Sequence, residues 1–120
     1  MMNTLALRWQ LLEPGAAGEP LQLVPGLWVD GEPLADPGSF AIDLAAWQRS
    51  LRAPGDYFLV TGWCGVAGCA GVRTPVAVRH GPEGIRWRVA EPVAWGELCF
   101  EPAACAEALA QGVCEGLAWL

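Results

Sequence analysis

The segment VAVRHGPEGIRWRV, residues 76–89, constrains the fold most, because apolar side chains recur at every second position on both sides of a Gly-Pro-Glu-Gly break. A period of two indicates a β-strand with one buried face, and a short glycine-bounded break between two such runs indicates a hairpin. With 81–84 as the connection, His80 pairs with Ile85. The buried face of the hairpin then carries Val76, Val78, Ile85, Trp87 and Val89. The rest of the chain must build a core on that face.

The opposite face of the hairpin is basic and carries Arg79, Arg86 and Arg88. Arg73 precedes Pro75, which has no N–H for a sheet ladder, so the regular strand begins near Pro75 or lies at an edge. The next strand buries Leu98 and Phe100 and turns Glu97, Cys99 and Glu101 toward the arginines. Two interpretations fit this face. It is a solvated surface whose ion pairs contribute roughly a few tenths of a kcal/mol each, or it is a strip that binds a partner.

Other segments also predict strands. In TLALRWQLL, residues 4–12, large apolar residues alternate with Ala6, Arg8 and Gln10, which indicates a half-buried strand. The short runs LQLV (21–24) and LWV (27–29) follow, and DGEP (30–33) predicts a turn. The segment DYFLVTG (56–62) is rich in aromatic and β-branched residues and predicts a buried strand over 57–61.

Two segments predict helices, near 43–52 and 102–118. Asp43 can cap the first helix, in which Leu44, Trp47 and Leu51 share one face. Pro102 suits the first turn of the second. The second helix has an apolar face made of Cys105, Leu109, Val113, Leu117 and Leu120. The fold class predicted is α+β: one antiparallel sheet, a meander of five to seven strands, covered by two helices in a single domain over 1–120.

Composition and charge limit the function classes. Hydrophobic residues make up 53% of the 120 residues and charged residues 17%, so a folded domain is expected. The net charge of −6 argues against nucleic-acid binding and suits a basic protein partner. No apolar run approaches the ~18 residues of a membrane span, and MMNTLALRWQLLE lacks the basic start of a signal peptide. Five cysteines, an odd number, point to reduced thiols in a cytoplasm.

The glycine-rich loop TGWCGVAGCAGV, residues 61–72, holds Cys64 and Cys69 at C-x4-C spacing. A structural zinc needs four ligands, and Cys64, Cys69, His80 and Cys99 could supply them if the loop, the hairpin turn and the last strand are neighbours. A redox pair matches less well, because oxidoreductases use C-x-x-C. We favour plain packing of a glycine-rich connection, and zinc or thiol chemistry in this loop is the alternative.

The other cysteines suit ordinary positions. Cys105 lies on the apolar face of the second helix and is expected in the core, whereas Cys114 lies toward solvent. A position of Cys99 next to Arg88 would favour a thiolate. No second cysteine at redox spacing accompanies Cys99, so we favour a role as a small strand residue.

The run YFLVTGWCGVAGCAGV, with the strand GIRWRV after it, resembles a group of small uncharacterised bacterial proteins in which a strand enters a loop of the type T-C-x-C-G-x-x-x-C-A-G. This chain has Gly62 where such relatives would have a cysteine, which weakens a ligand role at that position. The resemblance implies a bacterial, cytoplasmic protein and brings no established activity with it.

No catalytic motif of the types G-x-S-x-G, H-E-x-x-H or G-K-[ST] occurs, and His80 is the single histidine. We therefore expect a non-enzymatic protein that needs no cofactor, zinc belonging to the alternative. Seven tryptophans in a small acidic domain suit protein–protein interaction. An immunity or inhibitor-type protein that neutralises a basic toxin or nuclease is one such binder. The candidate binding residues are Trp63, Arg73, Arg79, Arg86 and Arg88.

Overall fold

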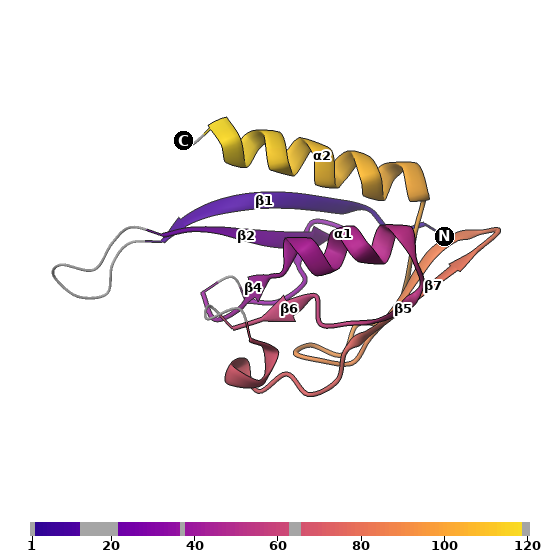
Figure 1. Ribbon diagram of the computed structural model, residues 1–120, viewed down its shortest axis with the longest axis horizontal. Coiled ribbons are helices and arrows are strands. Elements are labelled where there is room, and N and C mark those ends of the chain that lie inside the picture. Colours follow the sequence, from indigo (N-terminus) through magenta and orange to yellow (C-terminus); the bar gives the residue numbers. More distant parts are fainter. Residues whose placement is uncertain (1, 13–21, 37, 63–65, 119–120) are drawn as a thin grey trace, which may run out of the picture.

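The computed structural model describes residues 2–12, 22–36, 38–62 and 66–118. Over these ranges the chain is α+β, as the sequence predicts, and all its strand pairs are antiparallel (Figure 1). The prediction of one continuous meander is wrong, because the described strands form three sheets. Their strand orders are β1-β2-β3, β4-β6 and β5-β7-β8-β9.

The first sheet consists of β1 (Leu5–Leu12), β2 (Gln22–Val29) and β3 (Glu32–Pro33). The two runs predicted as separate strands are one strand, β2, which continues through Pro25. β3 pairs only with Trp28 and Val29, so β2 is an edge strand at Pro25, where a missing N–H is tolerated. The predicted turn is confirmed: Asp30 and Gly31 both have positive φ, 52° and 84°, as two-residue hairpin turns of this type require.

The predicted strand over 57–61 is in fact divided between two sheets. β5 (Gly55–Tyr57) pairs with β7, and β6 (Val60–Thr61) pairs with β4 (Ala41–Ile42). Between them Phe58 is exposed, and the Leu59 carbonyl accepts a hydrogen bond from the Asp43 backbone N–H. The chain therefore leaves one sheet and joins another within two residues.

The third sheet contains the hairpin of β7 (Val76–Gly81) and β8 (Gly84–Val89), followed by β9 (Gly96–Phe100). The predicted register is confirmed, because His80 pairs with Ile85 and Trp87 with Leu98. The predicted core face is buried too, and the Trp87 and Phe100 rings meet edge to face with centroids 4.8 Å apart. Aromatic pairs favour this geometry.

The first predicted helix is confirmed as α1 (Leu44–Arg52), where the Asp43 side chain accepts a hydrogen bond from the Ala46 N–H. This bond satisfies one of the backbone donors at the helix start. Trp47 is fully buried, so the apolar side of α1 packs against the core.

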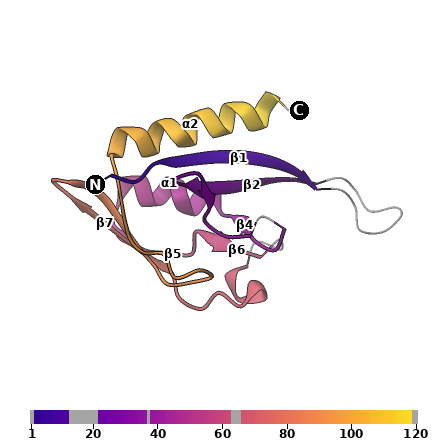
Figure 2. The same cartoon turned by 180° about the vertical axis from the view of Figure 1, so that it is seen from behind.

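The second predicted helix is confirmed as α2 (Pro102–Ala118), but its predicted apolar face is only partly buried. Cys105, Ala108 and Gly112 are buried, whereas Val113 and Leu117 are 41% and 61% exposed, and Leu120 lies outside the described residues. The buried side of α2 consists of small residues because β1 lies close to the helix. The Trp9 indole N–H donates a hydrogen bond to the Gly112 carbonyl at 2.6 Å. Figures 1 and 2 show α2 running along β1, with α1 beside it.

Candidate functional site

The exposed face of the third sheet gathers the basic side chains that the sequence predicts there. Arg79 lies directly opposite Arg86, and Arg88 is opposite Ala77 on the same face. On β9, Cys99 pairs with Arg86 and Glu97 with Arg88. Cys99 therefore lies beside Arg86 and not beside Arg88. We call the surface formed by Arg79, Arg86, Arg88, Glu97 and Cys99 the arginine face.

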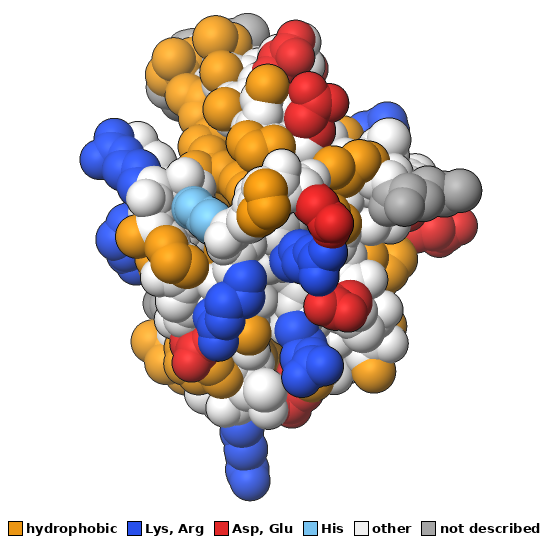
Figure 3. All heavy atoms as spheres, turned by 90° about the vertical axis from the view of Figure 1, so that its right-hand side faces the viewer, with side chains coloured by type: hydrophobic (Ala, Val, Ile, Leu, Met, Phe, Trp, Pro, Cys, Tyr) orange, Lys and Arg blue, Asp and Glu red, His pale blue; other side chains and the backbone are white. Residues whose placement is uncertain are grey.

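Carboxylates accompany the arginines on this surface. Arg86 forms an ion pair with Glu83 in the hairpin turn, and this hydrogen bond, together with the charge of Glu83, raises the pKa of Arg86. Arg79 approaches Asp56 of β5 at 3.8 Å and donates to its neighbour's carbonyl, that of Val78. Figure 3 shows arginine and carboxylate side chains interspersed on this end of the molecule. These pairs are exposed, so they contribute little to stability.

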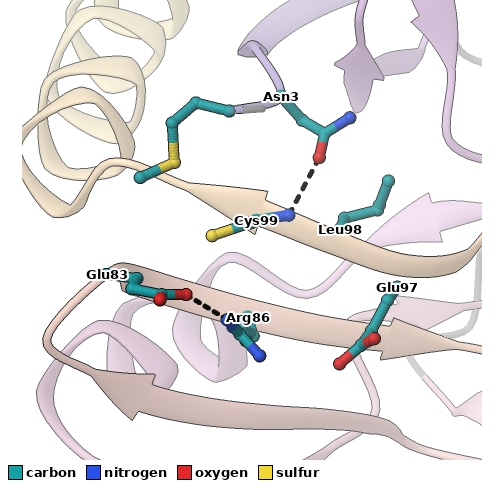
Figure 4. Close-up of a pocket in the computed structure, with 7 residues that line it drawn as sticks. Asn3, Glu83, Arg86, Glu97, Leu98 and Cys99 are labelled. Carbon is teal, nitrogen blue, oxygen red and sulfur yellow. Dashed lines mark hydrogen bonds and ion pairs between the residues drawn. The ribbon is translucent and has the colours of Figure 1, made fainter.

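Two shallow hollows mark the arginine face. One, of about 350 Å³, lies over Arg79, Arg86, Arg88 and Glu97. The other, of about 550 Å³, lies between β9, the hairpin turn and the N-terminal residues, with Arg86 between Glu83 and Glu97 (Figure 4). The surface can therefore accept partner groups that alternate in charge.

Asn3 forms one wall of the larger hollow. Its backbone N–H donates to the Cys99 carbonyl at 2.7 Å, and its side-chain oxygen accepts from the Cys99 N–H at 2.9 Å (Figure 4). Both backbone groups of Cys99 are thus used on the outer side of β9. Asn3 was not among the predicted site residues, since an isolated asparagine near the start of a chain gives no sequence signal for this contact.

Arg73 lies at the end of the arginine face, before the ladder begins. The backbone N–H groups of Arg73 and Thr74 donate to the Glu91 carboxylate at 3.2 and 2.7 Å. Hydrogen bonds from Thr74, and then from Arg73, hold the pKa of Glu91 below its ordinary value. Arg73 is therefore fixed where β7 begins, beyond Ala77 and Arg88.

The predicted binding residue Trp63 and the predicted ligand Cys64 lie outside the described residues. The described part of the loop contains the 3-10 helix η1 (Ala67–Ala70), which ends at Gly71 with φ 78°. Cys69 lies in η1 and is exposed. η1 packs beside β6 and leads through Val72 to the start of β7, the end of the arginine face at which Arg73 lies.

The proposed zinc ligands are not gathered in the part of the chain that is described. His80 shares its face with Ile85 and Phe100, and its ring nitrogen is 2.7 Å from the Ser50 carbonyl oxygen of α1. Cys99 points to the opposite face of the same sheet, so these two side chains do not share a ligand sphere. Among residues 2–12, 22–36, 38–62 and 66–118 no group of three potential ligands occurs.

Cys105 occupies the core position that the sequence predicts, and Cys114 is exposed as expected. Burial, with a smaller contribution from Cys99, raises the pKa of the Cys105 thiol to about 12. A thiol with so high a pKa stays protonated and is a poor nucleophile at neutral pH. Its role in this fold is packing.

A surface that the sequence did not predict lies between α1 and α2. This groove has a volume of about 730 Å³, and its walls are mostly apolar. They include Leu44, Leu51, Ala106, Leu109, Ala110 and Val113. Hydrophobic side chains gather in the upper half of Figure 3, the part of the molecule where α2 lies. The sequence does contain one signal for this groove, the pair Gly112 and Gly116. Their spacing favours close packing of the opposite side of α2 against the domain, which leaves the groove side at the surface.

Neither described helix combines the length and apolar character needed to cross a membrane. No family model, curated protein or solved structure matches this chain. The resemblance of the loop to small bacterial proteins therefore stays a prediction.

Proposed function

We propose that this protein is a non-enzymatic domain that binds another protein through the arginine face. The observation that carries the proposal is the direct pairing of Arg79 with Arg86, with Arg88 beside them on the same exposed surface. Because like charges directly opposite each other in a sheet oppose folding, this pairing does not serve stability, and we attribute it to binding. Arginine is enriched at protein interfaces, because its planar guanidinium makes several directed hydrogen bonds.

The charge balance of the face indicates the kind of partner. Arg79, Arg86 and Arg88 are balanced locally by Asp56, Glu83 and Glu97. The net charge of −6 therefore resides on the rest of the molecule. Long-range attraction favours a basic partner, while the contact surface itself selects a partner with alternating charges.

An immunity or inhibitor-type protein of a bacterial cytoplasm would have this combination of properties, and we place the protein in that class. A basic toxin or nuclease is then the partner. The hollow beside Asn3 and Cys99 gives the partner a shaped contact at one side of the face.

The proposal is tested by affinity capture from the native lysate with quantitative mass spectrometry. The decisive variant is Arg79→Gln with Arg88→Gln. Its control, Arg8→Gln with Arg49→Gln, also loses two exposed arginines and so has the same net charge. We expect a basic protein to be enriched by the wild type and the control but not by the decisive variant. Equal enrichment by all three baits, or no enrichment by the wild type, would contradict the proposal.

A further inference from the structure

The helix α2 has two apolar sides. The fold buries one of them, and of the second only Leu109 packs against the core. Cys105, Ala108 and Gly112 pack toward the rest of the domain. We call the second side, which forms one wall of the α1–α2 groove and continues to the end of the helix, the outer stripe. It consists of Ala106, Leu109, Ala110, Val113 and Leu117. Their spacing of three and four residues is that of a helix-packing surface.

The outer stripe is complementary to a second copy of itself. Ala106 and Leu117 lie equally far along the helix from the point between Gln111 and Gly112, and so do Ala110 and Val113. A two-fold axis through that point pairs α2 with an antiparallel α2, so that Leu117 faces Ala106 and Val113 faces Ala110 of the second copy, while Leu109 faces Cys114. Such self-complementarity is what a two-fold symmetric interface requires.

The charges of the groove agree with the same arrangement. Arg52 is the charged residue among those that line the groove, and no ionisable residue lies in the outer stripe. Figure 1 shows α1 ending on the side of the molecule where α2 begins. The two-fold axis therefore places each Arg52 near the end of the partner's α2. That last turn contains no basic residue, and its backbone carbonyls carry a partial negative charge.

We propose that the α1–α2 groove is the interface of a two-fold symmetric dimer, in which each groove receives α2 of the second copy. The groove shares no residue with the arginine face, so this inference does not depend on the proposed function.

Sedimentation equilibrium over a wide range of protein concentration tests the dimer. The wild type is expected to reach twice the chain mass of 12.8 kDa. Leu117→Asp is expected to raise the dissociation constant about tenfold or more. The control is Val93→Asp, which adds the same charge at another exposed valine, 49% accessible and distant from the groove residues in sequence. It is expected to dimerise like the wild type.

Two further variants keep the test decisive. Ala110→Arg, at an exposed helical position, should weaken the dimer as Leu117→Asp does, and far-UV circular dichroism reports whether each variant is folded. Arg52→Gln should weaken the dimer by a smaller factor. A wild type that stays monomeric at the highest concentration would overturn the proposal. So would folded Leu117→Asp and Ala110→Arg variants that dimerise like the wild type.

Discussion

Asp30 illustrates how one side chain serves both a turn and a tertiary contact. It adopts a positive φ of 52° in the β2–β3 turn, a conformation that aspartate and asparagine tolerate. Its carboxylate accepts hydrogen bonds from the Thr4 N–H and the Asn3 amide, both at 2.7 Å. The bonds from Thr4 and Asn3 lower the pKa of Asp30 from its ordinary value of 3.8.

We predict that Asp30→Asn makes the protein less stable near neutral pH and that this difference shrinks in acid. A carboxylate with a lowered folded-state pKa stabilises the fold above its unfolded pKa, about 4, and this contribution is lost as the pH falls through the folded value. Asparagine keeps the turn geometry. Urea unfolding at several pH values measures the difference, and a difference that is constant with pH would show that the charge of Asp30 is irrelevant.

At the scale of elements, the contact between α2 and β1 depends on glycine. A Cβ at Gly112 would lie well inside van der Waals contact of the Leu7 side chain, and one at Gly116 would lie 2.6 Å from the Trp9 ring. The helix can approach the strand this closely because neither position has a side chain. This close approach also explains why the outer stripe is left at the surface.

Gly112→Ala is predicted to destabilise the protein by about 1–3 kcal/mol, the usual cost of overpacking. In a free helix the same change would be favourable by about 1 kcal/mol. A net loss therefore shows that packing outweighs helix propensity. Gly81→Ala is the control, because nothing lies within 4 Å of a Cβ there. Urea unfolding of both variants decides, and equal stability would contradict the close contact.

The elements that could be predicted from the sequence are those with a clear period. The β7–β8 register and the buried and exposed faces of that hairpin follow from alternation on both sides of 81–84. The break at Phe58 and Leu59 could not be predicted, because the run Tyr57–Thr61 is strand-like throughout and local pattern does not show which sheet a strand joins. For α2, the predicted apolar face is only partly buried: Cys105 lies in the core, but Val113 and Leu117 are exposed. The close approach of Leu7 and Trp9 to the glycines of α2 decides which side is buried, and this is a tertiary property.

The candidate site was predictable to a similar degree. Arg79, Arg86 and Arg88 share a face because strand side chains alternate, which the sequence shows directly. The alternative zinc site required His80 and Cys99 to lie together. Their positions in the ladder place them on opposite faces of the sheet. Asn3 and the α1–α2 groove depend on contacts between segments far apart in the chain, which no local pattern encodes.

At the scale of the whole molecule, Asn3 connects two of the sheets. It binds Cys99 of β9 and Asp30 in the turn of the first sheet. Asn3→Ala removes both side-chain contacts. We predict a loss of roughly 0.5–1.5 kcal/mol, mostly from the Cys99 N–H, which lies in a partly buried position and loses its acceptor.

Ser39→Ala is the matched control for Asn3→Ala, because its side-chain bond to Asp36 joins residues of a single exposed turn. Urea unfolding measures the stability of both variants, and hydrogen exchange should be faster at Cys99 in Asn3→Ala alone. If the two variants are equally stable, Asn3 does not couple the sheets.

The contact between Asn3 and β9 also bears on aggregation. β9 is the outermost strand of its sheet, and an exposed strand of this kind is a template on which other chains can polymerise. An incoming strand would need the N–H and carbonyl groups of Cys99, and Asn3 already uses both. Asn3 thus blocks the middle of this sheet edge, so that an incoming strand cannot pair with β9 at Cys99.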